Sequence, residues 1–399
     1  NYFLDLMYIS YLASLASFPL VLYYSVEISL ITVINNLIFV PFFSFFLMPL
    51  ILVTFLFPSL MSITNFLFKL LERLSLFISS FDVVLIFGKP SLIIVFLYYF
   101  LIVMFLKYKK KTYLGILLVL LTIHYNLNWF NPNALVLVFD VGQGDSILVN
   151  YPYNKGTVLI DTGGTTSYNK EKWQERRKKY HPAKGVITYL KSIGIKNIDY
   201  LILTHGDYDH AGDAIYLLDN FKVSNVIFPD TKQNNLISEI ISYLKRKKIH
   251  YYFLKSGDRI KISNYNLNVL APFKKSENTN DSSLVLQTKI YKRSFLFLGD
   301  ISKSIEKEII EKYPTLKADF LKVAHHGSKT STSRDLIEKV SPKYAFISSG
   351  RNNPFNHPSI ETINILKVYN VKIFNTQEVG SIKCVLNSES VETFLTSPP

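Results

Sequence analysis

The first third of the chain contains very few charged residues. Residues 1–133 hold seven of the 44 lysines and arginines and four of the 30 aspartates and glutamates. Uncharged apolar stretches of about 18 residues or more are typical of membrane-spanning helices. Four segments fit this description: 6–24, 28–57, 91–106 and 113–129. We therefore predict that residues 1–130 form a multi-pass region of the cytoplasmic membrane.

Cysteine is almost absent, because Cys384 is the only one. An intrachain disulfide is therefore excluded. This fits a cytoplasmic location but does not rule out the outer face of a membrane. The chain starts with Asn1, directly before an apolar region, and shows no signal-peptide pattern. We expect it to be part of a longer protein.

Two features of the apolar region predict how it lies in the membrane. Within residues 62–80, charged residues such as Lys69 and Arg73 alternate with apolar ones at helical spacing, which is typical of a helix in the membrane surface. Four lysines lie in residues 107–111, and short basic loops stay on the cytoplasmic side. The next span would then place the domain from Ala134 outside, unless helices further upstream impose the opposite orientation.

From Ala134 the pattern changes to short apolar runs that alternate with amphipathic ones, and it predicts a layered α/β domain over residues 134–399. Strands are predicted at 134–140, 146–151, 157–160, 199–204, 224–228, 267–270, 283–289, 294–298, 319–323, 344–348 and 372–375. Helices are predicted at 184–193, 211–219, 235–248, 303–312, 332–339 and 359–368.

The strongest chemical signal is the sequence Thr-His-Gly-Asp-Tyr-Asp-His-Ala-Gly at residues 204–212, which follows an apolar strand. Side chains alternate in direction at such a turn, so His205 and Asp207 can bind one cation. Asp209 and His210 can bind its neighbour, and Asp209 is also expected to be essential for catalysis. Histidine with carboxylate suits zinc, manganese or iron.

Further polar residues follow other predicted strands. Asp300 is expected to bridge two cations, and His326 to be a ligand. Three residues are expected to position ligands or loops without binding metal themselves: Asp140, Asp161 and His325. Taken singly, an aspartate after a strand is more often a helix cap and a histidine is more often structural, so the assignment depends on the whole set.

This order of motifs resembles the metallo-β-lactamase superfamily, whose fold is an αββα sandwich, and more narrowly the ComEC family of competence DNA-uptake proteins. The segments that carry the resemblance are 139–146, 161–164, 205–210, 280–283, 298–300, 324–328 and 357–358, together with 36–41 in the apolar region. The resemblance implies that residues 1–130 are the last part of the family's competence (channel) region.

Two departures from the wider superfamily concern the first metal position. Asp207 stands where a histidine is common, and the usual third histidine is not evident. ComEC-like proteins share both departures. A ligand set poorer in nitrogen favours manganese over a tight zinc site, although one cation alone is also compatible with it.

The resemblance implies metal-dependent hydrolysis of a phosphodiester. Two cations roughly 3.5–4 Å apart would share Asp300 and activate a water for in-line attack on phosphorus. Lys322 or His357 would stabilise charge or protonate the leaving oxygen. Asn280 and Ser283 would contact phosphate or the water.

A basic surface points to a polyanionic partner, because 37 of the basic and 26 of the acidic residues remain after residue 133. The densest cluster is predicted to contact DNA phosphates without reading sequence: Arg176, Arg177, Lys178 and Lys179. A lysine-rich genome or a solvated helix face would give the same composition. Residues 245–248 form a second cluster for which DNA contact and a solvated face are equally compatible.

Three functions remain open. The first is a nuclease that degrades one DNA strand while the other crosses the membrane, with lipid and other uptake proteins as partners. The second is a hydrolase of a thioester, a lactam or a small phosphodiester. The third is a domain that docks DNA without cleaving it.

Overall fold

The computed structural model describes residues 2–31, 35, 39–81, 83–165, 180–274, 278–389 and 391–396. Contacts within the chain define two compact units, which we call the N-terminal and the C-terminal unit. The N-terminal unit comprises Asn1–Leu127 with Leu190–Ile195, and the C-terminal unit comprises Asn128–Tyr189 with Lys196–Pro399.

The N-terminal unit is mainly helical. Its elements are α1 (Tyr2–Ser25), β1 (Glu27–Ser29), a π-helix (Phe43–Leu47) that continues into α3 (Met48–Leu56), a 3₁₀-turn (Pro58–Leu60), α4 (Met61–Ser79), β2 (Val84–Ile86), α5 (Leu92–Tyr108) and α6 (Lys111–Tyr125). The apolar segment predicted at 28–57 is not helical at its start. Residues 27–29 are a strand instead, because their backbone pairs with β2 in antiparallel register.

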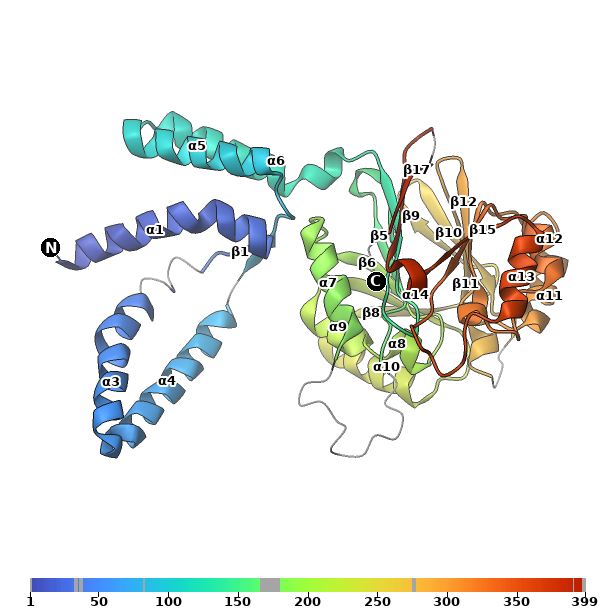
Figure 1. Ribbon diagram of the computed structural model, residues 1–399, viewed down its shortest axis with the longest axis horizontal. Helices are drawn as coiled ribbons and strands as arrows, with labels where there is room; N and C mark the ends of the chain where they lie inside the picture. The colour runs from blue at the N-terminus through green and yellow to red at the C-terminus, as the bar shows by residue number, and fades with distance from the viewer. Residues whose placement is uncertain are drawn as a thin grey trace. The chain divides into compact units, whose positions relative to one another are not determined.

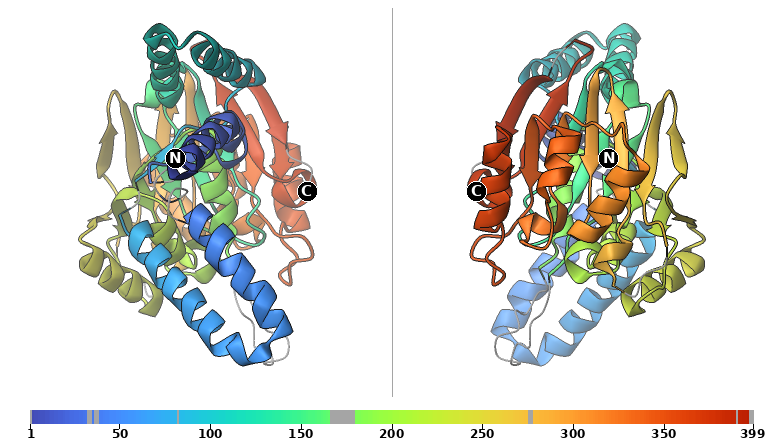
Figure 2. Two further views of the ribbon diagram at one scale, coloured as in Figure 1. Left: turned by 90° about the vertical axis from the view of Figure 1, so that its left-hand side faces the viewer. Right: turned by 90° about the vertical axis from the view of Figure 1, so that its right-hand side faces the viewer.

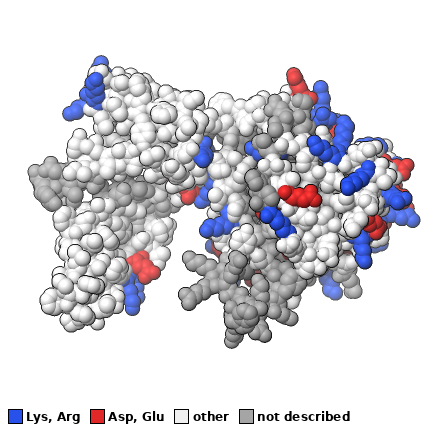
Figure 3. Space-filling model, viewed as in Figure 1, with Lys and Arg blue, Asp and Glu red and all other residues white. Residues whose placement is uncertain are grey.

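Among the described residues, one helical stretch, Phe39–Leu56, is long and apolar enough to cross a membrane. Helices α5 and α6 are apolar but shorter. Many of the unit's apolar side chains are exposed, such as Phe55 at 86%, and the unit carries few charges (Figure 3). Such a surface is typical of a protein region that contacts lipid or further protein.

Helices α3 and α4 form a hairpin, in which the buried hydroxyls of Thr54 and Thr64 lie 2.6 Å apart (Figure 1). Helix α4 covers the segment predicted to be amphipathic, and its position in the membrane surface stays a prediction. Helices α5 and α6 lie side by side around a small core that includes Leu101 and Leu117.

Two sheets make up the C-terminal unit. The first has the order β17-β16-β3-β4-β5-β6-β7-β8 and the second β15-β14-β13-β12-β11-β10-β9. The strands are β3 (Ala134–Val138), β4 (Ile147–Asn150), β5 (Thr157–Ile160), β6 (Ile198–Ile202), β7 (Val223–Pro229), β8 (His250–Leu254), β9 (Arg259–Ile262), β10 (Tyr265–Ala271), β11 (Val285–Ile290), β12 (Arg293–Phe297), β13 (Phe320–Lys322), β14 (Tyr344–Ile347), β15 (Lys372–Asn375), β16 (Ile382–Leu386) and β17 (Val391–Thr396). From β5 to β8 and from β12 to β15, neighbouring strands run parallel.

The two sheets pack face to face, and their inner faces share one apolar core to which Val136 and Ile160 contribute from the first sheet and Phe297 and Phe346 from the second. Helices cover both outer faces (Figures 1 and 2). These helices are α7 (Pro182–Ser192), α8 (Tyr208–Ala211), α9 (Ala214–Asn220) and α10 (Asn235–Lys247) by the first sheet, and α11 (Lys303–Lys312), α12 (Arg334–Val340) and α13 (Ile360–Val368) by the second, with α14 (Thr376–Val379) after β15. The predicted αββα sandwich is therefore confirmed.

Candidate metal centre

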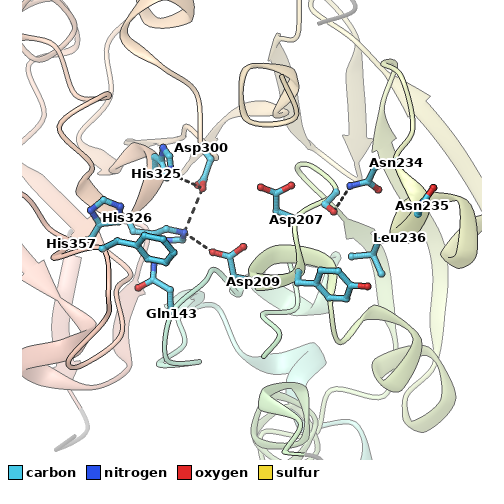
Figure 4. Close-up of a pocket in the computed structure, with 13 residues that line it drawn as sticks. Gln143, Asp207, Asp209, Asn234, Asn235, Leu236, Asp300, His325, His326 and His357 are labelled. Carbon is cyan, nitrogen blue, oxygen red and sulfur yellow. Dashed lines mark hydrogen bonds and ion pairs between the residues drawn. The ribbon is translucent and has the colours of Figure 1, made fainter. Parts of the chain in front are cut away.

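The candidate site lies where the carboxyl ends of parallel strands from both sheets meet, which is where open α/β sheets usually bind ligands. Strand β6 leads into His205, β12 into Asp300 and β13 into His326. A cavity of about 630 Å³ opens there (Figure 4). It is lined by Gln143, Gly206, Asp207, Tyr208, Asp209, Asn234, Asn235, Leu236, Asp300, His325, His326, Phe355 and His357.

The buried carboxylate of Asp300 is at the centre of this arrangement. Its Oδ2 lies 3.3 Å from Nε2 of His210 and 3.5 Å from Nε2 of His326. Nε2 of His325 is 3.9 Å away and Nε2 of His205 is 4.0 Å away. One oxygen therefore faces four imidazole nitrogens that come from both sheets.

The histidines are held from behind, so that the same nitrogen of each ring faces the centre. Nδ1 of His210 lies 2.8 Å from Oδ2 of Asp161, and Nδ1 of His326 lies 2.9 Å from the carbonyl oxygen of Ser348. A hydrogen bond at Nδ1 fixes the orientation of the ring and leaves Nε2 as the ligand atom. Asp161 also accepts hydrogen bonds from the amide and the hydroxyl of Thr204, so it ties two strand ends together.

Charges in the centre compensate one another. Burial alone would raise the pKa of Asp300, but His210 and His326 hold it well below its usual value. Burial likewise opposes protonation of His326, yet Asp300 and two further carboxylates raise the pKa of that ring to about 10. Asp209, whose Oδ2 is 3.3 Å from Nε2 of His326, has a pKa lowered to about 2 by His326 and His210 despite its burial.

The donor set fits a divalent cation. One ligand atom from each of Asp145, His210, Asp300 and His326 lies within 4.8 Å of those of the other three, and all four residues are buried. Among the described residues, Oδ1 of Asp300 and Nε2 of His205 have no hydrogen-bond partner. Buried polar atoms without a partner cost free energy, and a bound cation would satisfy them.

Two residues predicted to bind a first cation lie beside this cluster. Nε2 of His205 is 3.8 Å from Oδ2 of Asp207, a partly exposed residue that directly precedes α8. Burial and the neighbouring His210 lower the pKa of His205. A neutral His205 ring, whose Nε2 lies near the carboxylates of Asp207 and Asp300, is suited to bind a metal ion.

Asp145 is a site residue that the sequence reasoning did not select. It ends a glycine-rich loop, and its amide donates to the carbonyl oxygen of Asp209 at 3.2 Å. A Cβ at Gly144 would come within 2.1 Å of that same carbonyl oxygen, so glycine is required for the close approach. The glycines that flank Gln143 and the aspartate that closes this motif were the available signal.

Lys322 does not line the cavity, contrary to the role predicted for it. It is buried, and its Nζ lies 2.7 Å from Oδ2 of Asp145 and 3.1 Å from the carbonyl oxygen of Val323. Strand β13 is an interior strand of its sheet, so a side chain near its end meets protein rather than solvent. Lys322 compensates the charge of Asp145 and does not reach the cavity.

Three other predicted residues also lie away from the cavity. The Ser283 hydroxyl is buried and accepts a hydrogen bond from the amide of Asp300, so it supports that loop from behind. Asn280 lies in a 3₁₀-turn just before it. Asp140 is exposed and accepts from the amide of Gly142.

His357 and His325 do line the cavity. The two rings are 5.7 Å apart between centroids, and Nδ1 of His357 has no hydrogen-bond partner among the described residues. Burial and the neighbouring His326 lower the pKa of His357 to about 4, so this ring is neutral near pH 7.

The predicted DNA-binding cluster of Arg176, Arg177, Lys178 and Lys179 lies outside the described residues. The second basic cluster, residues 245–248, forms the last turn and the C-cap of α10. Cations stabilise a helix at this end, so its charge has a structural explanation of its own.

Comparison with known proteins agrees with the two-part organisation. Residues 139–351 match the metallo-beta-lactamase superfamily, and residues 1–112 match the competence protein family. ComE operon protein 3 of Bacillus subtilis is 33% identical over 99% of this chain and 53% of that protein. Recombination protein 2 of Haemophilus influenzae is 31% identical over 67% of this chain and 31% of that protein. Competence protein ComA of Neisseria gonorrhoeae is 26% identical over 65% of this chain and 33% of that protein. The chain thus spans about a third to a half of the length of these relatives.

We predict that Asp209→Ala abolishes or greatly weakens binding of a divalent cation, because it removes a carboxylate that faces His326 across the cluster. Titration calorimetry of the full chain in detergent with Mn²⁺ and with Zn²⁺ measures this. Asp335→Ala, an exposed position on α12, serves as the matched control and is expected to bind like the parent. Equal affinities for Asp209→Ala and the parent would remove Asp209 from the ligand set.

We also predict that Lys322→Met lowers the melting temperature Tm of the C-terminal unit by about 6–20 °C, because removing one partner of a buried ion pair costs about 3–5 kcal/mol. The double variant Lys322→Met, Asp145→Asn is expected to recover at least half of the loss. Thermal unfolding of the full chain in detergent with a chelator measures both. A Tm within 2 °C of the parent for the single variant would contradict the role given to this pair.

Proposed function

The chain belongs to the metallo-β-lactamase superfamily and, with its competence domain, to the ComEC family of DNA-uptake proteins, and we propose that its C-terminal unit hydrolyses phosphodiester bonds of DNA. One observation carries this proposal: the buried cluster of Asp145, His210, Asp300 and His326 is part of the same chain as a competence domain. We propose further that the strand cleaved is the one that is not transported.

We propose that Asp209, His210 and His326 hold one divalent cation. His205 and Asp207 hold a second, and Asp300 lies between the two groups. Cations bound there would stabilise negative charge on a phosphate and lower the pKa of a nearby water. A donor set in which carboxylates equal or outnumber imidazoles favours manganese over zinc.

Other residues of the cavity wall could contact the substrate. His357 and His325 lie on the side of the cavity that carries His326 (Figure 4). Because Lys322 is paired with Asp145, His357 is the candidate that contacts the leaving oxygen, to which its neutral ring can donate a hydrogen bond. On the opposite side, Asn235 and Asn234 begin α10, and Asn234 is held by its hydrogen bond to the carbonyl oxygen of Gly206.

We predict that the full chain in detergent shortens a labelled DNA strand in the presence of Mn²⁺ or Zn²⁺, and that a chelator stops the reaction. Asp209→Asn should lower the rate at least 100-fold, because the loss of a metal ligand removes the charge stabilisation. Gel analysis of labelled single-stranded and duplex DNA measures the products, with Asp335→Asn as the matched control.

The same experiment separates the other functions that the sequence left open. Cleavage of bis-nitrophenyl phosphate without cleavage of DNA would replace the proposal with a small phosphodiesterase. Binding of DNA with no metal-dependent cleavage of either substrate would replace it with a docking domain.

We propose that the chain crosses the cytoplasmic membrane several times, in contact with lipid and other uptake proteins, and that the C-terminal unit lies on the outer face. Helix α5 ends at Tyr108 and α6 begins at Lys111, so the lysines lie in or beside a short turn. Short loops with this positive charge stay on the cytoplasmic side. Helix α6 rises about 1.5 Å per residue and covers about 22 Å of a hydrocarbon core about 30 Å thick, and the 3₁₀-turn Leu127–Phe130 follows it. The exposed rings of Trp129 and Phe130 suit the interface where such a span ends.

We predict that a cysteine placed at the exposed position Ser388, in a Cys384→Ser background, reacts with a membrane-impermeant maleimide in intact cells. Cys384 is buried on strand β16, so its removal does not change the exposed surface. Mass-tagged gels of cells labelled before and after lysis measure the reaction. Labelling only after lysis would place the C-terminal unit in the cytoplasm.

A further inference from the structure

The cavity wall offers a phosphate-bearing strand little positive charge of its own. No lysine or arginine lies among the described residues that line the cavity, and three of the lining residues are carboxylates, Asp207, Asp209 and Asp300. Phosphate charge must therefore be met by bound cations and imidazoles at one point. The rest of a nucleotide needs a contact of another kind.

Phe355 supplies an apolar surface at this place. Phenylalanines such as Phe297, Phe320 and Phe346 are buried in the sandwich core, whereas Phe355 is 50% exposed and lines the cavity. Its ring stacks on that of His357, with centroids 5.7 Å apart and an angle of 19° between the planes. The Phe355 side chain is therefore half exposed at the cavity wall.

The loop that carries Phe355 is held in place by Asn353. The side-chain amide of Asn353 donates to the carbonyl oxygens of Gly350 and His357, at 2.8 and 2.7 Å, and its Oδ1 accepts from the amide of His357 at 2.9 Å. Gly350 in turn donates to the side chain of Gln143. The ring is thus presented by a braced loop, which lowers the entropic cost of using it as a contact surface.

A series of rings leads from the metal cluster to Phe355. The rings of His326 and His357 are 6.5 Å apart, and that of Phe355 follows at 5.7 Å from His357. A strand with one phosphate at the cluster can therefore place a neighbouring base at Phe355. Tyr208, 56% exposed, lies on the cavity wall between Asp207 and Asp209 and offers a second ring.

We infer that Phe355 is a stacking platform for an unpaired base of the DNA strand whose phosphate lies at the metal cluster. This inference rests on the proposed function and deepens it. Every base has a π-face, so stacking is tolerant of sequence. A base inside a duplex is already stacked on its neighbours and unavailable, so the platform selects single-stranded DNA.

The test compares two strands of equal charge, a thymidine 12-mer and an abasic 12-mer, both with phosphorothioate linkages that slow cleavage. Fluorescence anisotropy with the full chain in detergent and Mn²⁺ measures Kd. Phe355→Ala should raise Kd for the thymidine strand by about 5- to 150-fold, the value of one stacked base, and leave Kd for the abasic strand unchanged. The factor should be equal at low and moderate salt, because stacking releases no counterions.

Two further variants separate stacking from support of the loop. Phe355→Trp should keep the parent's affinity, whereas Phe355→Leu, which is apolar but lacks a π-face, should lose most of it. Equal weakening of both strands by Phe355→Ala would mean that the ring only supports His357, and unchanged affinity for both strands would equally overturn the inference. A parent chain that binds neither strand would instead refute the proposed function, and the platform with it.

Discussion

The Asp300 carboxylate is the constraint on which the site depends. It is almost fully buried, and an isolated ionised carboxylate in such a place would be prohibitively costly. Four imidazoles face one of its oxygens from strand ends of both sheets, and its other oxygen has no partner among the described residues. The negative charge of Asp300 is balanced either by protons on the histidines or by bound cations. The same residues can therefore hold the strand ends together and serve as metal ligands.

Much of the framework behind the site consists of backbone contacts. His326 is oriented by the carbonyl oxygen of Ser348, and the Ser348 hydroxyl donates to the carbonyl oxygen of Gly144 at 2.6 Å. The loop that ends in Asp145 is thereby tied both to the second sheet and to the turn that carries Asp209. Two charged groups belong to this layer as well: Asp161 holds His210, and Lys322 pairs with Asp145. A site held in this way keeps its geometry when protons or cations exchange.

The ends of apolar strands were informative in the sequence, because a polar residue after a buried parallel strand can only emerge at the edge where the sheets meet. Asp161, His205, Asp300 and His326 were identified on that ground. Asp145 was not, because it does not directly follow a strand, and its place in the cluster depends on a loop that approaches Asp209 closely at Gly144.

Other differences between the predictions and the structure also arise from contacts between residues that are far apart in the sequence. Lys322 is the last residue of strand β13, which is interior to its sheet, so the lysine meets Asp145 instead of the cavity. Strands β16 and β17 were not predicted, because β16 pairs with β3, almost 250 residues earlier in the chain. Strands β8 and β9 were missed where a basic helix end and a polar turn break the apolar pattern on either side.

If the C-terminal unit cleaves DNA as proposed, the distribution of charge separates capture of a strand from its cleavage. The cavity is lined by carboxylates, imidazoles, amides and rings, while lysines and arginines other than the buried Lys322 lie on the outer surface of the C-terminal unit (Figure 3). Helix α10 shows the contrast along one element. Its first residues, Asn235 and Leu236, line the cavity, and its basic last turn lies about 15–18 Å further along the helix at 1.5 Å per residue. Surface cations can attract a polyanion over about a Debye length without competing for the phosphate at the centre. A wall without lysine or arginine among its described residues would then let the product strand of the proposed reaction leave, because only the metal centre would hold its phosphates and only aromatic contacts its bases.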